Sequence, residues 1–433
     1  MGAVSTDPTI DPVIDTGLVD DLEWRGLIAH STDRDALREA LSAGSVRFYV
    51  GFDPTAPSLH MGNLVQILTA RRLQQAGHTP FALVGGATGM IGDPKESGER
   101  VLNSAETVRE WVQRVRGQIE PFLSFEGPNA ATMVNNLDWT QPMSTIDFLR
   151  DIGKHFPVNR MLARDVVRTR LEAGISYTEF SYVLLQSMDF LNLFRDHGVT
   201  LQFGGSDQWG NLTGGVELIR RAEGGHAHAF ATPLVTKADG TKYGKTEGGA
   251  LWLDPEMMSP YGFYQFWLNA EDEKVGELLR IFTFLPRAEI EALEAEHAEA
   301  PFRRTAQRRL AEEVTTLVHG AEETARIQAA SAALFGGGEL RDAGAATLRA
   351  ALETARPLLR VETLPGIVDL LVESGLCASK GEARRAVAEG GAYVNNVRVE
   401  DVEHVPSSDD LVDGRLLVLR RGKKNFAGVE LVS

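Results

Sequence analysis

The feature that most constrains the fold is a strand–helix–strand pattern near the start of the chain. Residues 46–52 (VRFYVGF) predict a buried strand, because β-branched and aromatic side chains dominate them. Residues 60–76 carry apolar side chains at helical spacing, and residues 81–84 form a second short apolar run before two glycines. Two strands joined through a helix imply a parallel sheet. We therefore expect an α/β, Rossmann-like nucleotide-binding domain with its ligands above the carboxyl ends of the strands.

The composition and the hydrophobic periodicity change along the rest of the chain. Residues 199–203 predict another strand, whereas residues 272–334 are rich in Ala, Glu, Leu and Arg at helical spacing. Gly336–Gly338 and the polar stretch after them predict a flexible linker before a small α+β module. The predicted domains are a catalytic domain (1–240), a signature loop with an α-helical domain (241–335), a linker (336–360) and the terminal module (361–433).

Composition narrows the class of protein. With 433 residues, 43% of them hydrophobic and 24% charged, the chain is long enough for several globular domains. A net charge of -16 argues against a protein that coats nucleic acid non-specifically. The single cysteine, Cys377, excludes an intrachain disulfide, and we expect it to serve packing in a reducing cytoplasm. Because no apolar run approaches the roughly 18 residues of a membrane span, we expect no membrane partner.

The segment 51–63 (GFDPTAPSLHMGN) follows the first strand and opens the helix. Helix N-termini bind phosphate through free N–H groups and the helix dipole, and Gly62 leaves room for a ligand against the backbone. The alternative is an ordinary turn capped by His60. A second segment, 237–246 (KADGTKYGKT), places Lys242 and Lys245 around Gly244 in a loop suited to closing over the pyrophosphate of ATP, although most lysine-rich loops are merely solvated.

A polar stripe crosses a third segment. In residues 178–196, Tyr182, Gln186 and Asp189 lie at i, i+4 and i+7, on one face of a predicted helix whose other positions are mostly apolar. Buried polar side chains must be paired. The stripe therefore predicts either a satisfied core network or a ligand-binding face.

Together these segments resemble the tyrosyl-tRNA synthetases of bacterial type, which are class I aminoacyl-tRNA synthetases. His60-Met61-Gly62-Asn63 and the lysine loop match the two class signatures. Further matching blocks are residues 48–55 (FYVGFDPT), 85–89 (GGATG), 91–94 (IGDP) and 204–211 (GGSDQWGN). The resemblance runs nearly end to end, and it implies tyrosine activation by ATP followed by transfer to tRNA(Tyr).

The resemblance also implies roles for individual residues. Asp189 and Tyr49 would bind the substrate phenol. Tyr182, Gln186 and Asp93 would hold its α-ammonium group, and Asn136 and Gln202 would support the pocket. The adenylate would lie against Gly51, Asp53, Gly62, Gly205, Asp207 and Gln208, together with His60 and Lys245. Charge on the departing pyrophosphate would meet Thr55, His60, Asn63, Lys242, Lys245 and Thr246. No protein metal site is expected, and Mg²⁺ would accompany ATP.

Three departures from the family pattern are visible. Asn63 stands where the family often has a second His, and the second signature is KYGKT rather than KMSKS, with both lysines retained. The loop KESGER after Pro94 differs in length or register, so Lys95 receives no role.

The terminal module resembles an S4 RNA-binding domain. Its basic residues are expected to contact tRNA phosphates: Lys380, Arg384, Arg385, Arg420, Arg421, Lys423 and Lys424. A solvated basic edge is the alternative. By the same resemblance the chain is expected to be a homodimer, with the tRNA spanning both subunits.

Other functions fit less well. Tryptophanyl-tRNA synthetase shares the fold, but an indole does not require both Tyr49 and Asp189. A non-catalytic RNA-binding relative would tolerate loss of Lys245 or Asp189, and both are present. A small-molecule nucleotidylyltransferase would need neither the helical domain nor the RNA-binding module.

Overall fold

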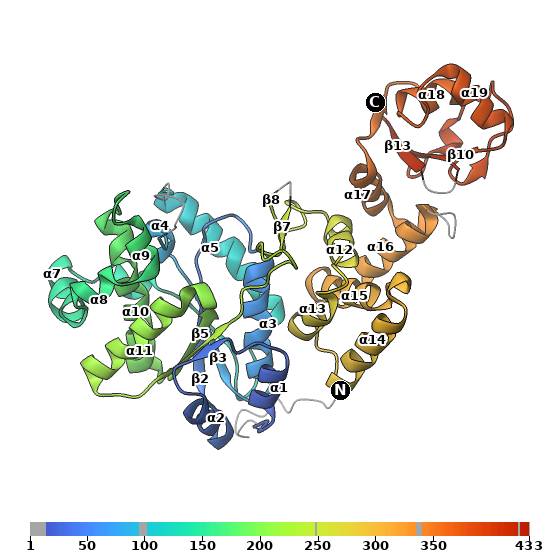
Figure 1. The fold of residues 1–433 in the computed structure, drawn as a ribbon. Coiled ribbons are helices and arrows are strands. Elements are labelled where there is room, and N and C mark those ends of the chain that lie inside the picture. The colour runs from blue at the N-terminus through green and yellow to red at the C-terminus, as the bar shows by residue number, and fades with distance from the viewer. Residues whose placement is uncertain (1–13, 95–101, 247–248, 335–339, 423–424, 433) are drawn as a thin grey trace. The chain divides into compact units, whose positions relative to one another are not determined.

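A computed structural model gives the fold of the chain (Figure 1). It describes residues 14–94, 102–246, 249–334, 340–422 and 425–432; the side chains of 165, 245, 246, 249, 341 and 342 lie outside the description. Two compact units are present. The first comprises residues 1–254 and 276–290, and the second comprises residues 255–275 and 291–433. The first unit extends to Asp254, past the boundary predicted at residue 240, because the second signature loop packs within it.

A six-stranded sheet forms the centre of the first unit, in the order β1-β6-β5-β2-β3-β4. Only β1 runs antiparallel to its neighbour, and the other pairings are parallel. This confirms the α/β fold class, with strands at 30–31, 228–232, 201–205, 47–52, 79–84 and 132–135 in sheet order. The register places Tyr49 between Phe81 and Gln202 on the neighbouring strands.

Helices cover both faces of this sheet (Figure 1). Helices α3 (Met61–Gln75) and α5 (Ala105–Ile119) lie on one face, while α10 (Tyr177–His197) and α11 (Trp209–Glu223) lie on the other. Since both faces are buried, strand residues 80–84 are all buried. The other α-helices of this unit before Asp254 are α1 (Leu18–Trp24), α2 (Arg34–Ala43), α4 (Thr88–Ile91), α6 (Leu137–Thr140), α7 (Thr145–Asp147), α8 (Val158–Leu162) and α9 (Asp165–Arg170).

Two arginines bind the end of helix α13 (Val275–Phe282), most of which belongs to the first unit. Arg25 donates to the carbonyl oxygens of Arg280 and Leu285 at 3.0 and 2.9 Å, and Arg72 donates to that of Thr283. The last carbonyls of a helix lack intrahelical partners. These two buried guanidinium groups supply partners around the end of α13.

The second unit is helical over much of its length. Its α-helices up to residue 355 are α12 (Pro260–Leu268), most of α14 (Arg287–Glu299), α15 (Thr305–His319), α16 (Ala321–Leu334) and α17 (Ala345–Ala355). The last of these corrects the predicted linker at 336–360. Leu348 and Leu352, four residues apart, are fully buried, so an Ala-rich stretch that looks like a spacer is a packed helix. Gly336–Gly338 lie outside the described residues.

A five-stranded sheet closes the chain, in the order β11-β10-β12-β13-β9. Its strands are β9 (Leu359–Val361), β10 (Ala392–Val394), β11 (Val397–Arg398), β12 (Leu416–Arg421) and β13 (Asn425–Leu431), with helices α18 (Ile367–Glu373) and α19 (Lys380–Ala388) packed on it. Cys377 is buried in this core, as expected. Within the described part of the chain, no helix is both long and apolar enough to cross a membrane.

Candidate active site

The predicted ligand site lies where parallel strands of the first unit end. Asp53 follows β2, Gly85 follows β3, Asn136 follows β4, and Asp207 comes just after β5. Carboxyl ends of parallel strands lie along one edge of the sheet, so residues far apart in sequence converge there.

The phenol end of the predicted tyrosine pocket is built around Asp189 on α10. This carboxylate is 2% exposed and accepts hydrogen bonds from Asn136 Nδ2 at 3.0 Å and Trp139 Nε1 at 2.8 Å. Burial raises the pKa of Asp189 to about 7, while the two donors act in the opposite direction. Tyr49 is also buried, and among the described residues its hydroxyl makes only a long contact of 3.5 Å, with the carbonyl oxygen of Gln186. A polar group of this kind can accept a better partner from a ligand.

Trp139 was not predicted from the sequence. It lies on α6, three residues after Asn136, and both residues donate to the same carboxylate. The available signal was its place directly after a strand end, in the run NNLDW.

Asp53 is the centre of a second network. It accepts hydrogen bonds from the hydroxyls of Tyr182 and Thr88, both at 2.6 Å. Gly85 allows this approach, because a Cβ atom at that position would lie 2.0 Å from Asp53 Oδ1. Asn136 Nδ2 also donates to Thr88 Oγ1 at 2.9 Å, which links this network to Asp189. The structure thus brings Tyr182 to Asp53, a residue predicted for the adenylate, and adds Thr88, which the sequence did not single out.

The groups predicted for the α-ammonium are acceptors. Asp93 accepts from Gln208 Nε2 at 2.9 Å and from Asn211 Nδ2 at 3.1 Å, and Arg164 donates to Asn211 at 2.6 Å. Two further amide oxygens, Oε1 of Gln186 and Oε1 of Gln202, are buried without a hydrogen-bond partner among the described residues. Since a buried, unpaired acceptor is unfavourable, the arrangement suits a ligand that brings donors.

The first signature forms a reciprocal helix cap. Gly62 N–H donates to His60 Nδ1 at 3.0 Å, and His60 N–H donates to Asn63 Oδ1 at 3.1 Å. The capping interpretation of this segment is therefore correct as geometry: the His60 ring caps the helix, and Asn63 caps His60 in return. Capping leaves His60 Nε2 as the ring nitrogen that a ligand can meet. His60, Gly62, Gly51 and Thr55 are all exposed, as expected at the mouth of a site.

The two signatures lie near each other, since a Cβ atom at Gly244 would lie 3.2 Å from Met61 Sδ. Although His60 reaches solvent at the mouth of the site, desolvation by the surrounding protein lowers its pKa; the charge of Lys242 lowers it further, and Asp207 opposes them. A neutral imidazole with an occupied Nδ1 carries its proton on Nε2, where it can donate to a phosphate. Lys242 is exposed, and the backbone of Lys245 and Thr246 forms strand β7, which pairs with β8 (Gly249–Ala250). The side chains of Lys245 and Thr246 lie outside the description, as does the loop with Lys95.

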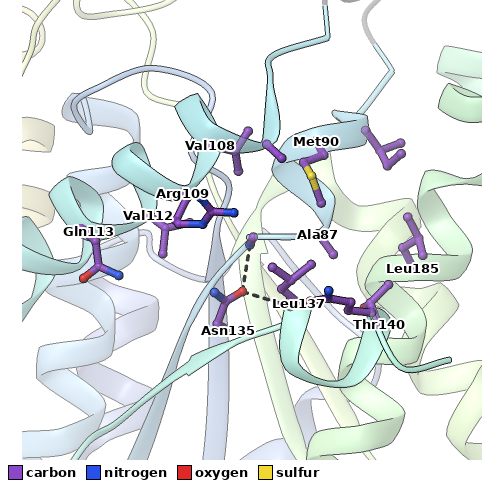
Figure 2. A pocket seen from close by; sticks show the side chains of 14 residues that line it. Ala87, Met90, Val108, Arg109, Val112, Gln113, Asn135, Leu137, Thr140 and Leu185 are labelled. Atoms are coloured by element: carbon purple, nitrogen blue, oxygen red, sulfur yellow. Dashed lines mark hydrogen bonds between the residues drawn. The ribbon is translucent and has the colours of Figure 1, made fainter.

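Two cavities flank this site. One of about 430 Å³ is lined in part by Asp93, Asp207 and Asn211, so it opens next to the predicted ammonium and adenylate groups. The other, of about 460 Å³, lies between α4, α5, α6 and Leu185 of α10. Figure 2 shows Asn135 at its wall, accepting from the backbone of Gly86 and Leu137. Its lining residues include none of those predicted to bind tyrosine or ATP.

The predicted RNA-binding arginines divide into two kinds. Arg384 and Arg385 are exposed on α19. In contrast, Arg420 is 9% exposed and lies over the ring of Tyr393 at 4.0 Å, and Arg421 forms an ion pair with Glu382 at 2.8 Å. Lys380 is paired with Asp369, and Lys423 and Lys424 lie outside the described residues.

Comparison with known proteins identifies the family of the chain. A family model described as "tRNA synthetases class I (W and Y)" matches residues 41–336, and another described as "Tyrosine--tRNA ligase SYY-like C-terminal domain" matches residues 353–429. The tyrosine–tRNA ligase of Streptomyces coelicolor is 65% identical over 419 residues, covering 96% of this chain and 99% of that protein. That of Kineococcus radiotolerans is 59% identical over 411 residues, covering 95% and 97%.

Solved structures of tyrosyl-tRNA synthetases are also similar to this chain. A C-terminally truncated mitochondrial tyrosyl-tRNA synthetase of Aspergillus nidulans has a TM-score of 0.65 at 31% identity, covering 72% of this chain and 92% of that chain. A tryptophanyl-tRNA synthetase of Encephalitozoon cuniculi, at 13% identity and a TM-score of 0.52, shares the fold alone. The resemblance read from the sequence is confirmed: the chain belongs to the tyrosine–tRNA ligases, class I tRNA synthetases that join tyrosine to its tRNA.

Proposed function

We propose that the buried pair Asp189 and Tyr49 recognises the phenol of tyrosine. The observation that carries this is a carboxylate held by two donors next to a buried hydroxyl with only a 3.5 Å contact. Phenylalanine would leave both groups desolvated and unpaired. Selection against a missing hydroxyl in this way needs no editing step, and tyrosyl-tRNA synthetases are themselves the standard example of it.

The α-ammonium group is assigned to Asp93 and Gln186, with Tyr182 beside them. A cation needs carboxylate and amide oxygens as acceptors, and Asp93 is oriented by Gln208 and Asn211. Because Tyr182 donates to Asp53, its hydroxyl oxygen remains able to accept from the ammonium group. Asn136 and Gln202 support the pocket.

Activation of tyrosine needs no general acid or base. The tyrosine carboxylate is already a nucleophile, so the site must place it in line with the α-phosphorus and stabilise the charge of departing pyrophosphate. The adenylate is assigned to Gly51, Asp53, Gly62, Gly205, Asp207 and Gln208. The pyrophosphate charge is assigned to Thr55, His60, Asn63, Lys242, Lys245 and Thr246. Mg²⁺ is proposed to enter on the phosphates of ATP; the described residues include no cluster of three or more His, Cys, Asp or Glu that could hold a metal.

Transfer to tRNA is assigned to the terminal module acting as an S4-like RNA-binding domain, in a cytoplasmic enzyme. Exposed Arg384 and Arg385 support phosphate contacts, and the negative overall charge of the chain makes such a local basic face important. The neutralising partner of Arg421 and the burial of Arg420 make these two weaker candidates.

A homodimer is proposed through the face formed by residues 146–177. Large apolar side chains are unusually exposed there: Ile146 is 68% and Tyr177 66% exposed, and Leu149, Val158, Leu162 and Leu171 are also exposed. Several large exposed apolar side chains within one segment of the chain are typical of an interaction site. Val158→Asp should shift the sedimentation coefficient towards that of a monomer, and an unchanged value would place the dimer contact elsewhere.

ATP–pyrophosphate exchange, run amino acid by amino acid, tests the proposed function. Exchange is expected with tyrosine and not with phenylalanine or tryptophan. Lys245→Ala should slow adenylate formation far more than it weakens tyrosine binding, because the developing pyrophosphate charge exists only in the transition state. A fall in tyrosine affinity at an unchanged activation rate would remove Lys245 from this role.

A further inference from the structure

Residues 249–254, called the strap below, join the two signatures of the catalytic unit. The strap begins with β8, the second strand of hairpin β7–β8, and runs antiparallel to residues 58–61. Met61 N–H donates to the carbonyl oxygen of Leu251 at 2.9 Å, and Leu253 N–H donates to that of Leu59, also at 2.9 Å. On its other side, Leu251 N–H donates to the carbonyl oxygen of Gly244 at 2.8 Å. These hydrogen bonds link the lysine loop, through the strap, to the start of α3.

Trp252 is the strap residue that meets His60. The two residues form an isolated antiparallel bridge, and their rings lie 6.2 Å apart at an interplanar angle of 55°. Trp252 is half-buried. The ring of His60 is also fixed from the helix side, because its Nδ1 accepts from Gly62, where a Cβ atom would lie 2.9 Å from His60 Cε1. The imidazole thus has the glycine at the helix start and the indole of the strap as neighbours.

We propose that Trp252 is a positioning residue for tyrosine activation, holding the His60 ring so that Nε2 faces the phosphates of ATP while the strap keeps both signatures in register. The inference rests on the proposed role of His60. It extends that role to a residue outside both signature motifs and outside the predicted ATP-binding set. A tilted aromatic contact at this separation is favourable and restricts ring rotation.

The physical reason for an effect on rate is geometric. The phosphate charge that His60 meets develops in the transition state, and a donor displaced by about 1 Å can lose on the order of a hundredfold in rate. Tyrosine binding uses residues of β2 and α10 instead, so it should be insensitive to Trp252. A residue that only stabilised the fold would lack this separation.

The experiment compares Trp252→Ala and Trp252→Phe in the full-length enzyme, by pre-steady-state formation of tyrosyl-adenylate and equilibrium binding of tyrosine. The alanine variant should form adenylate roughly tenfold to a hundredfold more slowly, with tyrosine affinity within about twofold of the parent. The phenylalanine variant should recover most of the rate, because it retains an aromatic ring. Trp111→Ala, on α5 and also half-buried, is the matched control and should leave the rate unchanged.

A double-mutant cycle with His60→Ala separates positioning from independent effects. If Trp252 acts through His60, adding Trp252→Ala to the His60→Ala enzyme should change the rate little. Equal loss in both backgrounds, or parallel loss of tyrosine affinity, would overturn the inference. So would an unimpaired Trp252→Ala enzyme beside an impaired His60→Ala enzyme. A normal rate in His60→Ala itself would instead remove His60 from the proposed function. Should the alanine variant fail to fold, Trp252→Leu in the same cycle gives the same decision.

Discussion

The proposed tyrosine pocket and the proposed basic face of the terminal module both depend on charged residues identified in the sequence, but these residues lie in different surroundings in the structure. Asp189 is buried and held by two donors, whereas Arg384 and Arg385 are exposed to solvent. A buried charge must be paired, so its hydrogen-bond partners are fixed and can be identified in the structure. A surface charge has many possible partners, and Arg421 and Lys380 have acidic neighbours that the motif does not reveal. Burial, more than charge itself, fixes the partners of a polar side chain.

The largest expected effect tests the buried side of this comparison. Asp189→Ala should lower kcat/KM for tyrosine on the order of 10³-fold. A hydrogen bond to a charged group contributes roughly 1.5–3 kcal/mol, and each buried donor left unpaired costs roughly 1–3 kcal/mol. Exchange kinetics with a parallel thermal melt provide the measurement, and isosteric Asp189→Asn serves as control for folding. A variant with unchanged KM and kcat for tyrosine would contradict the pocket.

The stability of the first unit should fall in acid because of a second buried group, His78. Burial lowers the pKa of His78 to about 4, and its side chain is 0% exposed. An unfolded His has a pKa of about 6.5. Above that pH the group has no effect on stability; between pH 6.5 and 4 only the unfolded chain takes up the proton, so the free energy of unfolding falls by about 3 kcal/mol.

The measurement is urea unfolding of the parent and of His78→Asn across this pH range. The raised pKa of Asp189, about 7, acts in the opposite sense over the same window, because the folded state holds the extra proton there. Only the difference between parent and variant isolates His78. Parallel pH profiles for the two proteins would show that His78 titrates normally in the folded state.

The exposed side of the comparison predicts a salt effect. Replacing both Arg384 and Arg385 with Ala should weaken tRNA binding and lower its salt dependence by roughly 0.7–0.9 log units for each phosphate that is no longer neutralised. Pyrophosphate exchange should remain normal. Arg420→Ala should behave oppositely, because its guanidinium is buried against Tyr393: it should lower the melting temperature and leave the salt slope intact. A salt slope that changes only in Arg420→Ala would reverse the assignment.

The smallest expected effect concerns Tyr49→Phe. Loss of one uncharged partner costs roughly 0.5–1.5 kcal/mol, which should erode discrimination against phenylalanine by about threefold to tenfold. Exchange kinetics with both amino acids decide this. Unchanged selectivity would show that Asp189 alone recognises the phenol.

The sequence by itself determined the parallel α/β sheet and the face of α10, because hydrophobic periodicity depends only on neighbours along the chain. The strand–helix–strand pattern at residues 46–84 and the stripe of Tyr182, Gln186 and Asp189 both became elements of the predicted type. The sequence motifs also predicted the family of the protein, and the comparisons confirm it.

Tertiary structure alone decided which polar groups meet. Trp139 and Thr88 join the pocket only because the ends of β3 and β4 lie side by side. Tyr182 donates to Asp53 across 129 positions of sequence. Helix α17 replaced a predicted linker because Leu348 and Leu352 find a core to pack against. Hydrogen bonding and burial depend on neighbours in space, and a local pattern specifies an element without naming the side chains that it will meet.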